Sequence, residues 1–297
     1  MALPALRLLD QSRHALVLVG RPWAGDLFAG MDWAFEPITD HILRDAKRLR
    51  VLMGTRTRLV RGLLFPNSAS SALLFRLAGI RAAGLATDGR RLLLSTALRE
   101  PPPMHEVERF WYVAANALRV WDERSIARTP PRVLGLVLTI AQRAVAQQLL
   151  TEHGVAERYA LLAPIAAGLH RGQNKQWPYF AELLSPLRSR GLMPIAVPTA
   201  QEAEATRRAL PAVQFLPPVA LGCLAAIAAR SSVVIANDSG VSHVAAAVGA
   251  PQVTIFGATD ANRTGPWSPR AVRVGENGRW PAVSNVIKAI DTACATE

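Results

Sequence analysis

The sequence predicts an α/β protein in which parallel sheets are covered by helices on both faces. Short, continuous apolar runs alternate with helical segments along most of the chain, which is the pattern of strands buried on both faces. The chain has 297 residues, near the length at which one hydrophobic core divides into two domains. Because 50% of its residues are hydrophobic, the chain can bury enough apolar surface to fold, and disorder is excluded.

Strands and helices can be assigned in order through the first half of the chain. Residues 14–20 and 61–65 read as buried strands, because each apolar run ends close to a proline. We expect weaker strands at residues 80–86 and 91–95, and helices at residues 69–78 and 105–121. Asn67 or Ser68 supplies the cap of the first of these helices.

A polar, proline-rich stretch at residues 122–132 lacks apolar periodicity and is the expected linker. It divides the chain into a domain at residues 1–131 and a domain at residues 132–297. The second domain shows the cleaner alternation. We expect its strands at residues 159–165, 192–197, 213–216, 232–236 and 252–256, and its helices at residues 140–153, 178–190, 201–210, 221–230 and 240–248.

The chain is basic, with 34 Lys and Arg residues against 22 Asp and Glu and a formal net charge of +12. The charge is spread along the sequence and is densest at residues 44–61. Two interpretations of this positive charge stay open. The Arg residues either lie on solvated faces or form a surface that binds an anionic partner. Aromatic residues are not interleaved with the basic ones, which argues against nucleic acid as that partner.

The cysteines and the hydropathy exclude several other classes. Cys223 and Cys294 have no Cys or His partner at metal-ligand spacing, so neither a disulfide framework nor a zinc site is predicted. No basic region precedes a long apolar run at the N-terminus, and no window approaches about 18 apolar residues. We therefore expect a cytoplasmic protein without a membrane span.

The segment at residues 232–269 carries the strongest chemical signal. A buried strand is followed by a short turn and then at once by an Ala-rich helix. The first amides of such a helix are unpaired donors at the positive end of its dipole, which makes them a site for a phosphate group. Gly240 leaves room for a ligand, and His243 lies one turn further on. Asp238 and Ser239 can cap the helix; each residue alone is more often structural, but together they favour a ligand site.

A second element, residues 168–178, is a Gly- and Arg-bearing loop between a strand and a helix. Lys175 either adds a positive charge to the same anion site or is a solvated loop lysine. The chain has no G-x-G-x-x-G after its first strand and no P-loop motif, so dinucleotide and P-loop sites are not supported. A serine hydrolase that uses Ser239 and His243 is a weaker alternative, because the flanking glycines of a G-x-S-x-G elbow are replaced.

Four stretches of the chain are distinctive. They are NDSGVSHVAAAVGAP at residues 237–251, IFGATDANRTGPWSP at residues 255–269, KQWP at residues 175–178 and LLFPNSASSALLFRLAGIRAAG at residues 63–84. Together they resemble glycosyltransferase family 9, the lipopolysaccharide heptosyltransferases, and the last is similar to the heptosyltransferase II branch. The resemblance implies the GT-B architecture, with two Rossmann-like domains that face a central cleft. It also implies inverting transfer of heptose, or a similar sugar, from a nucleotide diphosphate sugar such as ADP-heptose to the lipopolysaccharide inner core.

The same resemblance implies site residues and partners. The positions that match the family's donor-side motifs are Lys175, Glu202, Asp238, Ser239, Gly240, Val241 and His243, and those on the acceptor side are Asn67 and Ser68. No cofactor is implied, and the lack of an Asp-x-Asp pair agrees with a reaction that uses no metal. The implied partners are the nucleotide sugar, the lipopolysaccharide core or lipid A acceptor, and the cytoplasmic surface of the inner membrane, but no nucleic acid.

The chain departs from the family pattern at its start. Residues 1–9 match the family's first helix, so the strand before it and the Asp that serves as general base would lie ahead of Met1. The catalytic residue is therefore unassigned. Neighbouring strands would be left with unpaired backbone groups, each costing about 1–3 kcal/mol where buried. A start assigned too far downstream and a shortened, inactive paralogue that only binds the nucleotide sugar are the two explanations that remain open.

Overall fold

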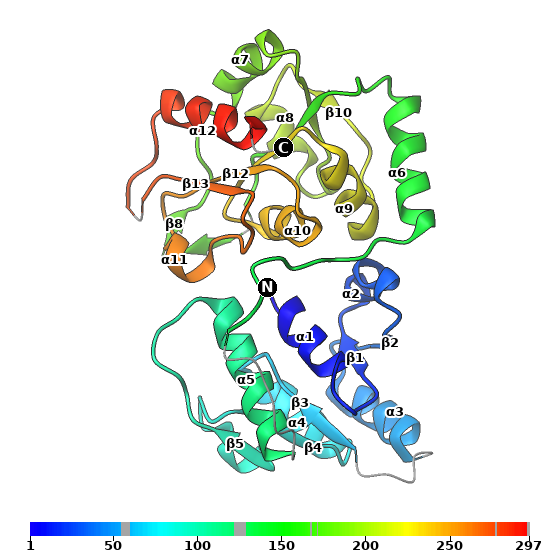
Figure 1. Ribbon diagram of the computed structural model, residues 1–297. Coiled ribbons are helices and arrows are strands. Elements are labelled where there is room, and N and C mark those ends of the chain that lie inside the picture. Colours follow the sequence, from blue (N-terminus) through cyan, green and yellow to red (C-terminus); the bar gives the residue numbers. More distant parts are fainter. Residues whose placement is uncertain (55–59, 122–128, 167, 171, 277, 296–297) are drawn as a thin grey trace. The chain divides into compact units, whose positions relative to one another are not determined.

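The chain forms two compact units in the computed structural model, which describes residues 1–54, 60–121, 129–166, 168–170, 172–276 and 278–295 (Figure 1). The N-terminal unit contains Ala2–Gly25 and Trp33–Pro131, and the C-terminal unit contains Asp26–Asp32 and Arg132–Glu297. Most of the linker expected at residues 122–132 lies outside the described residues.

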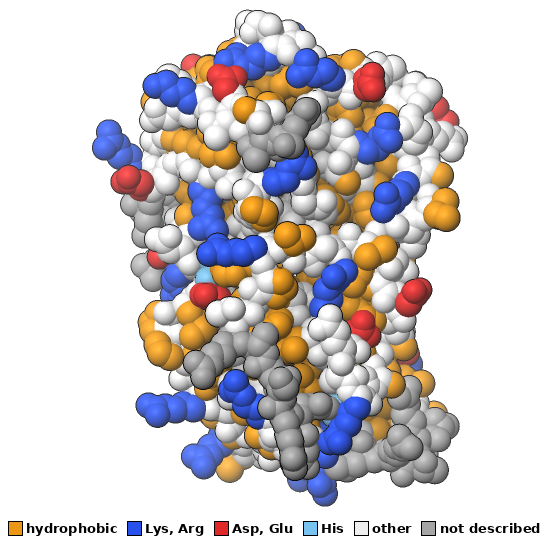
Figure 2. All heavy atoms as spheres, viewed as in Figure 1, with side chains coloured by type: hydrophobic (Ala, Val, Ile, Leu, Met, Phe, Trp, Pro, Cys, Tyr) orange, Lys and Arg blue, Asp and Glu red, His pale blue; other side chains and the backbone are white. Residues whose placement is uncertain are grey.

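Basic side chains are distributed over the surface as the sequence predicts. Figure 2 shows Lys and Arg side chains scattered singly over the visible face, with fewer acidic ones between them. Among the described residues, no helix is both long enough and apolar enough to cross a membrane.

The described part of the C-terminal unit is built on a six-stranded parallel sheet with the order β10-β9-β6-β11-β12-β13. Its strands are β6 (Tyr159–Ala163), β9 (Met193–Ala196), β10 (Gln214–Phe215), β11 (Val233–Asn237), β12 (Gln252–Ile255) and β13 (Ala271–Val274). All residues of β11 are buried, as expected for a central strand that is covered on both faces.

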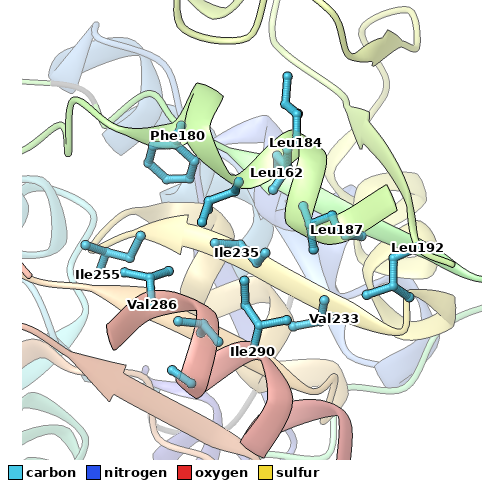
Figure 3. Close-up of a cluster of buried hydrophobic side chains, with 14 of the residues drawn as sticks. Leu162, Phe180, Leu184, Leu187, Leu192, Val233, Ile235, Ile255, Val286 and Ile290 are labelled. Atoms are coloured by element: carbon cyan, nitrogen blue, oxygen red, sulfur yellow. The ribbon is translucent and has the colours of Figure 1, made fainter. Parts of the chain in front are cut away.

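Helices cover both faces of this sheet. They are α6 (Ile140–Glu152), α7 (Leu184–Ser189), α8 (Ala203–Ala209), α9 (Leu221–Arg230), α10 (Gly240–Val248), α11 (Ala261–Thr264) and α12 (Val283–Ala295), with the 3-10 helix η3 (Phe180–Leu183) and the hairpin β7 (Leu169–His170) and β8 (Gln173–Asn174). Alternate strand residues such as Val233 and Ile235 pack against η3, α7 and α12 in the main core (Figure 3). On the other face, α10 contacts β11 and β12 and lies beside α9.

The segment Asp26–Asp32 belongs to the C-terminal unit, although the expected boundary placed it with residues 1–131. The carboxylate Oδ2 of Asp26 accepts a hydrogen bond of 2.6 Å from the backbone N–H of Gly222, in the first turn of α9. Gln142 donates from Nε2 to the Asp26 carbonyl at 2.6 Å. Asp26 therefore accepts from an amide in the first turn of α9 that has no acceptor within the helix. The negative charge of its carboxylate also interacts favourably with the positive amino end of the helix dipole.

The N-terminal unit holds two separate parallel sheets in its described residues, β1-β2 and β3-β4-β5. Its elements are α1 (Leu3–Asp10), β1 (Val17–Gly20), α2 (Pro22–Leu27), β2 (Ala34–Pro37), α3 (Ile42–Gly54), β3 (Arg61–Leu63), α4 (Ala69–Leu77), β4 (Arg81–Leu85), η2 (Arg90–Leu93), β5 (Thr96–Leu98) and α5 (Glu106–Val120). The last two residues of α2 and the whole of the 3-10 helix η1 (Ala29–Met31) lie in the segment Asp26–Asp32, which belongs to the C-terminal unit. The helix expected at residues 69–78 begins after Ser68, whose side chain accepts from the Ser71 N–H as its cap.

One expected element was wrong in type, and one expected helix is divided in two. Residues 91–95 were expected to form a strand, but the chain coils there as η2 and the strand is β5. The coil carries the Arg90 side chain inward, where it is 1% exposed and hydrogen-bonded. The helix expected at residues 178–190 is divided between η3 and α7.

Candidate functional site

The candidate site lies at the carboxyl edge of the six-stranded sheet, where the strand order reverses. From β6 the chain proceeds outward to β9 and β10, and from β11 it proceeds in the opposite direction to β12 and β13. In open parallel sheets, ligands bind outside the carboxyl ends of the strands at such a switch point. The switch point here falls between β6 and β11.

Asn237 organises this edge. It is the last residue of β11 and is 0% exposed. Its Nδ2 donates to the carbonyl oxygen of Pro164 beyond β6 at 2.5 Å, and its Oδ1 accepts from the backbone N–H of Trp177 at 3.0 Å. Trp177 is buried and donates from Nε1 to Pro281 at 3.0 Å. Sequence reasoning treated Asn237 only as a turn residue, although an amide at the end of an apolar strand is the signal that marks it.

The amino end of α10 keeps its first amides free of side-chain caps. Ser239 occupies the N-cap position with extended backbone (φ −148°, ψ 175°), but its side chain makes no cap hydrogen bond. The capping role expected for Asp238 or Ser239 was therefore wrong. Asp238 instead accepts from the Thr264 hydroxyl at 3.0 Å through Oδ2. The helix start thus retains donors and the positive end of its dipole for a ligand anion.

The residues around this helix start leave space on its outer side. Gly240 is exposed, and a Cβ built on it would have no atom within 4 Å. His243 Nε2 lies 3.8 Å from Asp238 Oδ1, an ion pair when the imidazole is protonated. Val241 is half-buried in the same turn.

The serine hydrolase alternative gains no support from this arrangement. The Ser239 hydroxyl is buried and has no hydrogen-bond partner, so it is not hydrogen-bonded to the His243 imidazole. A nucleophilic serine needs a base within hydrogen-bond reach to take its proton.

Lys175 and Glu202 lie in two other loops, which follow β6 and β9 of the same sheet. Lys175 lies two residues before Trp177, whose amide binds Asn237, so the loop that carries Lys175 is tied to the end of β11. Glu202 is the N-cap residue of α8, in the loop after β9. Its Oε2 accepts from the Thr199 hydroxyl at 2.8 Å, so this carboxylate already holds its own turn.

Sequence reasoning missed the contribution of α11. Asp260 caps this short helix by accepting from the Asn262 N–H at 2.9 Å, and the helix carries Thr264 to Asp238. Upstream, a Cβ at Gly257 would lie 2.2 Å from the Trp280 ring, so the loop needs glycine there. In the described parts of the chain, no group of three or more His, Cys, Asp or Glu gathers as metal ligands do.

Asn67 and Ser68, which the resemblance leads us to expect on the acceptor side, lie in the N-terminal unit, between β3 and α4. Asn67 accepts from an Arg90 guanidinium nitrogen at 3.1 Å through Oδ1. Arg90 also donates to the carbonyls of Leu85 and Pro66. Burial lowers the pKa of the Arg90 guanidinium, which nevertheless stays charged. A buried cation thus fixes the loop that carries Asn67, whereas Ser68 is exposed.

Known proteins resemble this chain in sequence. The model of glycosyltransferase family 9 (heptosyltransferase) matches residues 56–289. Lipooligosaccharide heptosyltransferase 2 of Haemophilus influenzae is 30% identical over 246 residues, covering 74% of this chain and 68% of that protein. Lipopolysaccharide heptosyltransferase 1 of Escherichia coli K12 is 28% identical over 127 residues, covering 38% of this chain, and there the chain spans only 40% of the relative's length.

Solved structures resemble it over nearly its whole length. The structure of E. coli ADP-heptose lipopolysaccharide heptosyltransferase II has a TM-score of 0.77 at 22% identity, covering 99% of this chain and 94% of that chain. The E. coli heptosyltransferase WaaC with ADP has a TM-score of 0.73 at 21% identity, covering 99% and 95%. At such identities the likeness concerns the fold, and it confirms the α/β architecture of the GT-B type.

Proposed function

The chain belongs to glycosyltransferase family 9 (heptosyltransferase), as its motifs predict, and on this premise we propose that it transfers heptose from a nucleotide diphosphate sugar to the lipopolysaccharide inner core. ADP-heptose is the proposed donor, because one similar structure is of an ADP-heptose heptosyltransferase and another contains ADP. The proposed acceptor class follows from the lipopolysaccharide and lipooligosaccharide named for the relatives.

One observation carries the proposal for the donor site. The uncapped amino end of α10 lies at the switch point of a parallel sheet, beside the loop that Asn237 ties to β11. Free amides and a helix dipole at this place suit a diphosphate. We assign Asp238, Ser239, Gly240, Val241 and His243 to the donor site, with Lys175 as a further cation and Glu202 as a more distant contact.

The proposed reaction is a single displacement with inversion. The acceptor hydroxyl oxygen bonds to the anomeric carbon of the donor sugar, the bond from that carbon to the diphosphate oxygen breaks, and the hydroxyl proton passes to a base. The amides of α10 and the Lys175 ammonium stabilise the charge that develops on the departing diphosphate. The base stays unassigned in this chain.

Calorimetry with ADP tests the donor site directly. Lys175→Ala should weaken ADP binding about 10- to 100-fold, since a hydrogen bond to a charged group contributes about 1.5–3 kcal/mol. Lys288→Ala is the matched control, because it removes an exposed lysine from α12 of the same unit. Equal affinities of the two variants would refute the assigned role of Lys175.

Activity itself is tested with ADP-heptose and a lipopolysaccharide core acceptor that lacks heptose. The expected result is an acceptor product heavier by one heptose, with release of ADP, as measured by mass spectrometry. Donor binding without any transfer would instead favour the second reading of the sequence, an inactive paralogue that only binds the nucleotide sugar.

We also propose that the acceptor is met at the inner membrane surface, and α3 is the segment that supports this. Its exposed residues combine apolar and basic side chains, namely Leu43, Arg44, Lys47, Arg48, Arg50 and Val51. Each Lys or Arg near an anionic bilayer contributes about 1 kcal/mol. Arg44→Glu with Lys47→Glu should abolish sedimentation with anionic vesicles, and unchanged sedimentation would contradict a role for α3.

A further inference from the structure

Two aspartates of the C-terminal unit stand just before helix starts, but their carboxylates are used differently. Asp260 caps α11 by accepting from the Asn262 N–H, two residues further on, at 2.9 Å. Asp238 likewise stands two residues before Gly240, the first residue of α10. Its Oδ2 instead accepts from the hydroxyl of Thr264, 26 residues away in the chain, at 3.0 Å. A contact from outside the helix start therefore decides where the Asp238 carboxylate lies.

A carboxylate that bonded to the first amides of α10 would compete with a ligand anion. Asp is among the preferred capping residues, because its oxygens accept from the free amides and its charge interacts favourably with the helix dipole. The same amides and the same dipole are what a phosphate group binds. Because Asp238 belongs to the same chain, its carboxylate would be a competitor that is always present. A diphosphate can bind this helix start only if Asp238 is held off it.

The Thr264 hydroxyl is the group that holds Asp238. Among the described residues, the Asp238 carboxylate contacts Thr264 at 3.0 Å and His243 Nε2 at 3.8 Å, and only the first distance is that of a hydrogen bond. Thr264 Oγ1 also lies 3.3 Å from the Asp260 carbonyl oxygen. A hydroxyl has one hydrogen to donate, and a carboxylate binds it more strongly than a neutral carbonyl does.

The position of Thr264 is itself fixed from the sheet. Arg273 of β13 donates from Nη1 to the carbonyl of Ala261 at 3.2 Å and from Nη2 to the carbonyl of Pro266 at 3.1 Å. One guanidinium thus binds the chain on both sides of Thr264. The helix α11 has only four residues and would not be stable alone, so this contact supports it. The γ-branched atoms of a threonine also have few rotamers, which restricts the hydroxyl.

We propose that Thr264 is a positioning residue for the donor site. Its hydroxyl holds the Asp238 carboxylate off the amino end of α10, so that the first amides of this helix stay open for the diphosphate of the donor. Without the hydroxyl, the carboxylate bonds to those amides and inhibits donor binding from within the chain. This inference rests on the donor site proposed above.

The first test measures ADP binding by calorimetry. Thr264→Val removes the hydroxyl but keeps the branched shape, and it should weaken ADP binding about 3- to 30-fold, the equivalent of one helix cap. Thr264→Ser keeps the hydroxyl and should stay within about twofold of the parent chain. Thr292→Val is the matched control, because it removes a hydroxyl that donates to the Lys288 carbonyl on α12 of the same unit.

The second test repeats the substitution without the competing carboxylate. In an Asp238→Ala background, Thr264→Val should change ADP affinity by less than about twofold, because the two effects act through one contact. An equal loss in both backgrounds would overturn the inference, since Thr264 would then act without Asp238. Unchanged affinity in Thr264→Val alone, or a loss in Thr264→Ser as large as that in Thr264→Val, would overturn it as well.

A third test needs no nucleotide. Hydrogen exchange of the Gly240 and Val241 amides should slow at least about threefold in Thr264→Val, and this slowing should vanish when Asp238→Ala is added. If the parent chain binds no ADP, the proposed donor site fails, but this exchange still decides the role of Thr264. Slowing that depends on Asp238 supports the inference, whereas unchanged exchange, or slowing that persists without Asp238, overturns it.

Discussion

The Oδ1 atom of Asn237 accepts a hydrogen bond of 3.0 Å from the backbone N–H of Trp177, which lies 60 residues earlier in the chain. The Nδ2 atom of the same Asn237 side chain donates to the carbonyl oxygen of Pro164. One buried side chain therefore connects the end of β11, the end of β6 and the loop that carries Lys175. The geometry of the candidate donor site thus depends on a residue that need not touch the donor.

Replacing Asn237 by Leu should destabilise the C-terminal unit by about 2–5 kcal/mol. The change leaves the Trp177 N–H and the Pro164 carbonyl buried without partners, and each unpaired group costs about 1–3 kcal/mol. Urea unfolding measures the difference. Asn262→Ala is the control, since the exposed side chain of Asn262 should change stability by no more than about 0.5 kcal/mol. Equal stabilities of the two variants would contradict the organising role of Asn237.

Sequence reasoning predicted best where local pattern decides structure. Helices α9 and α10 have the predicted bounds, because apolar, Ala-rich runs stand between clear turns. Helix α3 was missed because five charged residues interrupt its apolar pattern, and the face that it buries is recognised only once it packs against α4. The strand expected at residues 91–95 was wrong because the Arg90 side chain is held inward by the carbonyls of Leu85 and Pro66, the second of which lies 24 residues earlier in the chain.

The residue types of the candidate site were readable from the sequence, but their contacts were not. A strand, a short turn and an Ala-rich helix indicate a phosphate site by local order alone. Asp238 accepts a hydrogen bond from Thr264 of α11, which lies near it because β11 pairs with β12. Such tertiary contacts decide whether a side chain caps its helix or leaves it open.

Ser239→Ala should leave the free energy of unfolding unchanged or raise it slightly. The Ser239 hydroxyl is buried without a hydrogen-bond partner, so its removal abolishes an unfavourable desolvation. Urea unfolding measures this directly, with Ser68→Ala as the contrasting variant, because the Ser68 side chain caps α4 and its loss should cost about 1 kcal/mol. A larger loss from Ser239→Ala than from Ser68→Ala would show that the hydroxyl makes a stabilising contact.

Arg90→Met should destabilise the N-terminal unit by about 3 kcal/mol or more. Three oxygen atoms, from Leu85, Pro66 and Asn67, would lose their shared donor in a buried place. In a double-mutant cycle, Arg90→Met and Asn67→Ala should be non-additive by about 0.5–3 kcal/mol, because the two side chains contact each other. Additive losses would contradict the inferred positioning of Asn67 by Arg90.

The pair between Arg190 and Asp291 should give stability a defined pH dependence. The Arg190 Nε lies 2.6 Å from Asp291 Oδ1, and Nη2 lies 3.0 Å from Oδ2, so the guanidinium binds the carboxylate with two hydrogen bonds. The hydrogen bond from Arg190 holds the pKa of Asp291 below its ordinary value. A lowered folded pKa stabilises the fold above the unfolded pKa, near 3.9, and this contribution is lost as the pH falls through the folded value.

Asp291→Asn should therefore cost at most about 1 kcal/mol at pH 7, because the exposed pair is screened by solvent and salt. The difference from the parent chain should shrink below about pH 4 and vanish once Asp291 is protonated in both folded and unfolded states. Urea unfolding from pH 7 to pH 2 measures this dependence, and Asp40→Asn is a parallel case in the other unit that should show the same sign, because the hydrogen bond from Arg21 lowers the pKa of Asp40. A difference that grows toward low pH has the wrong sign for a carboxylate stabilised by Arg190, and it would refute the pairing.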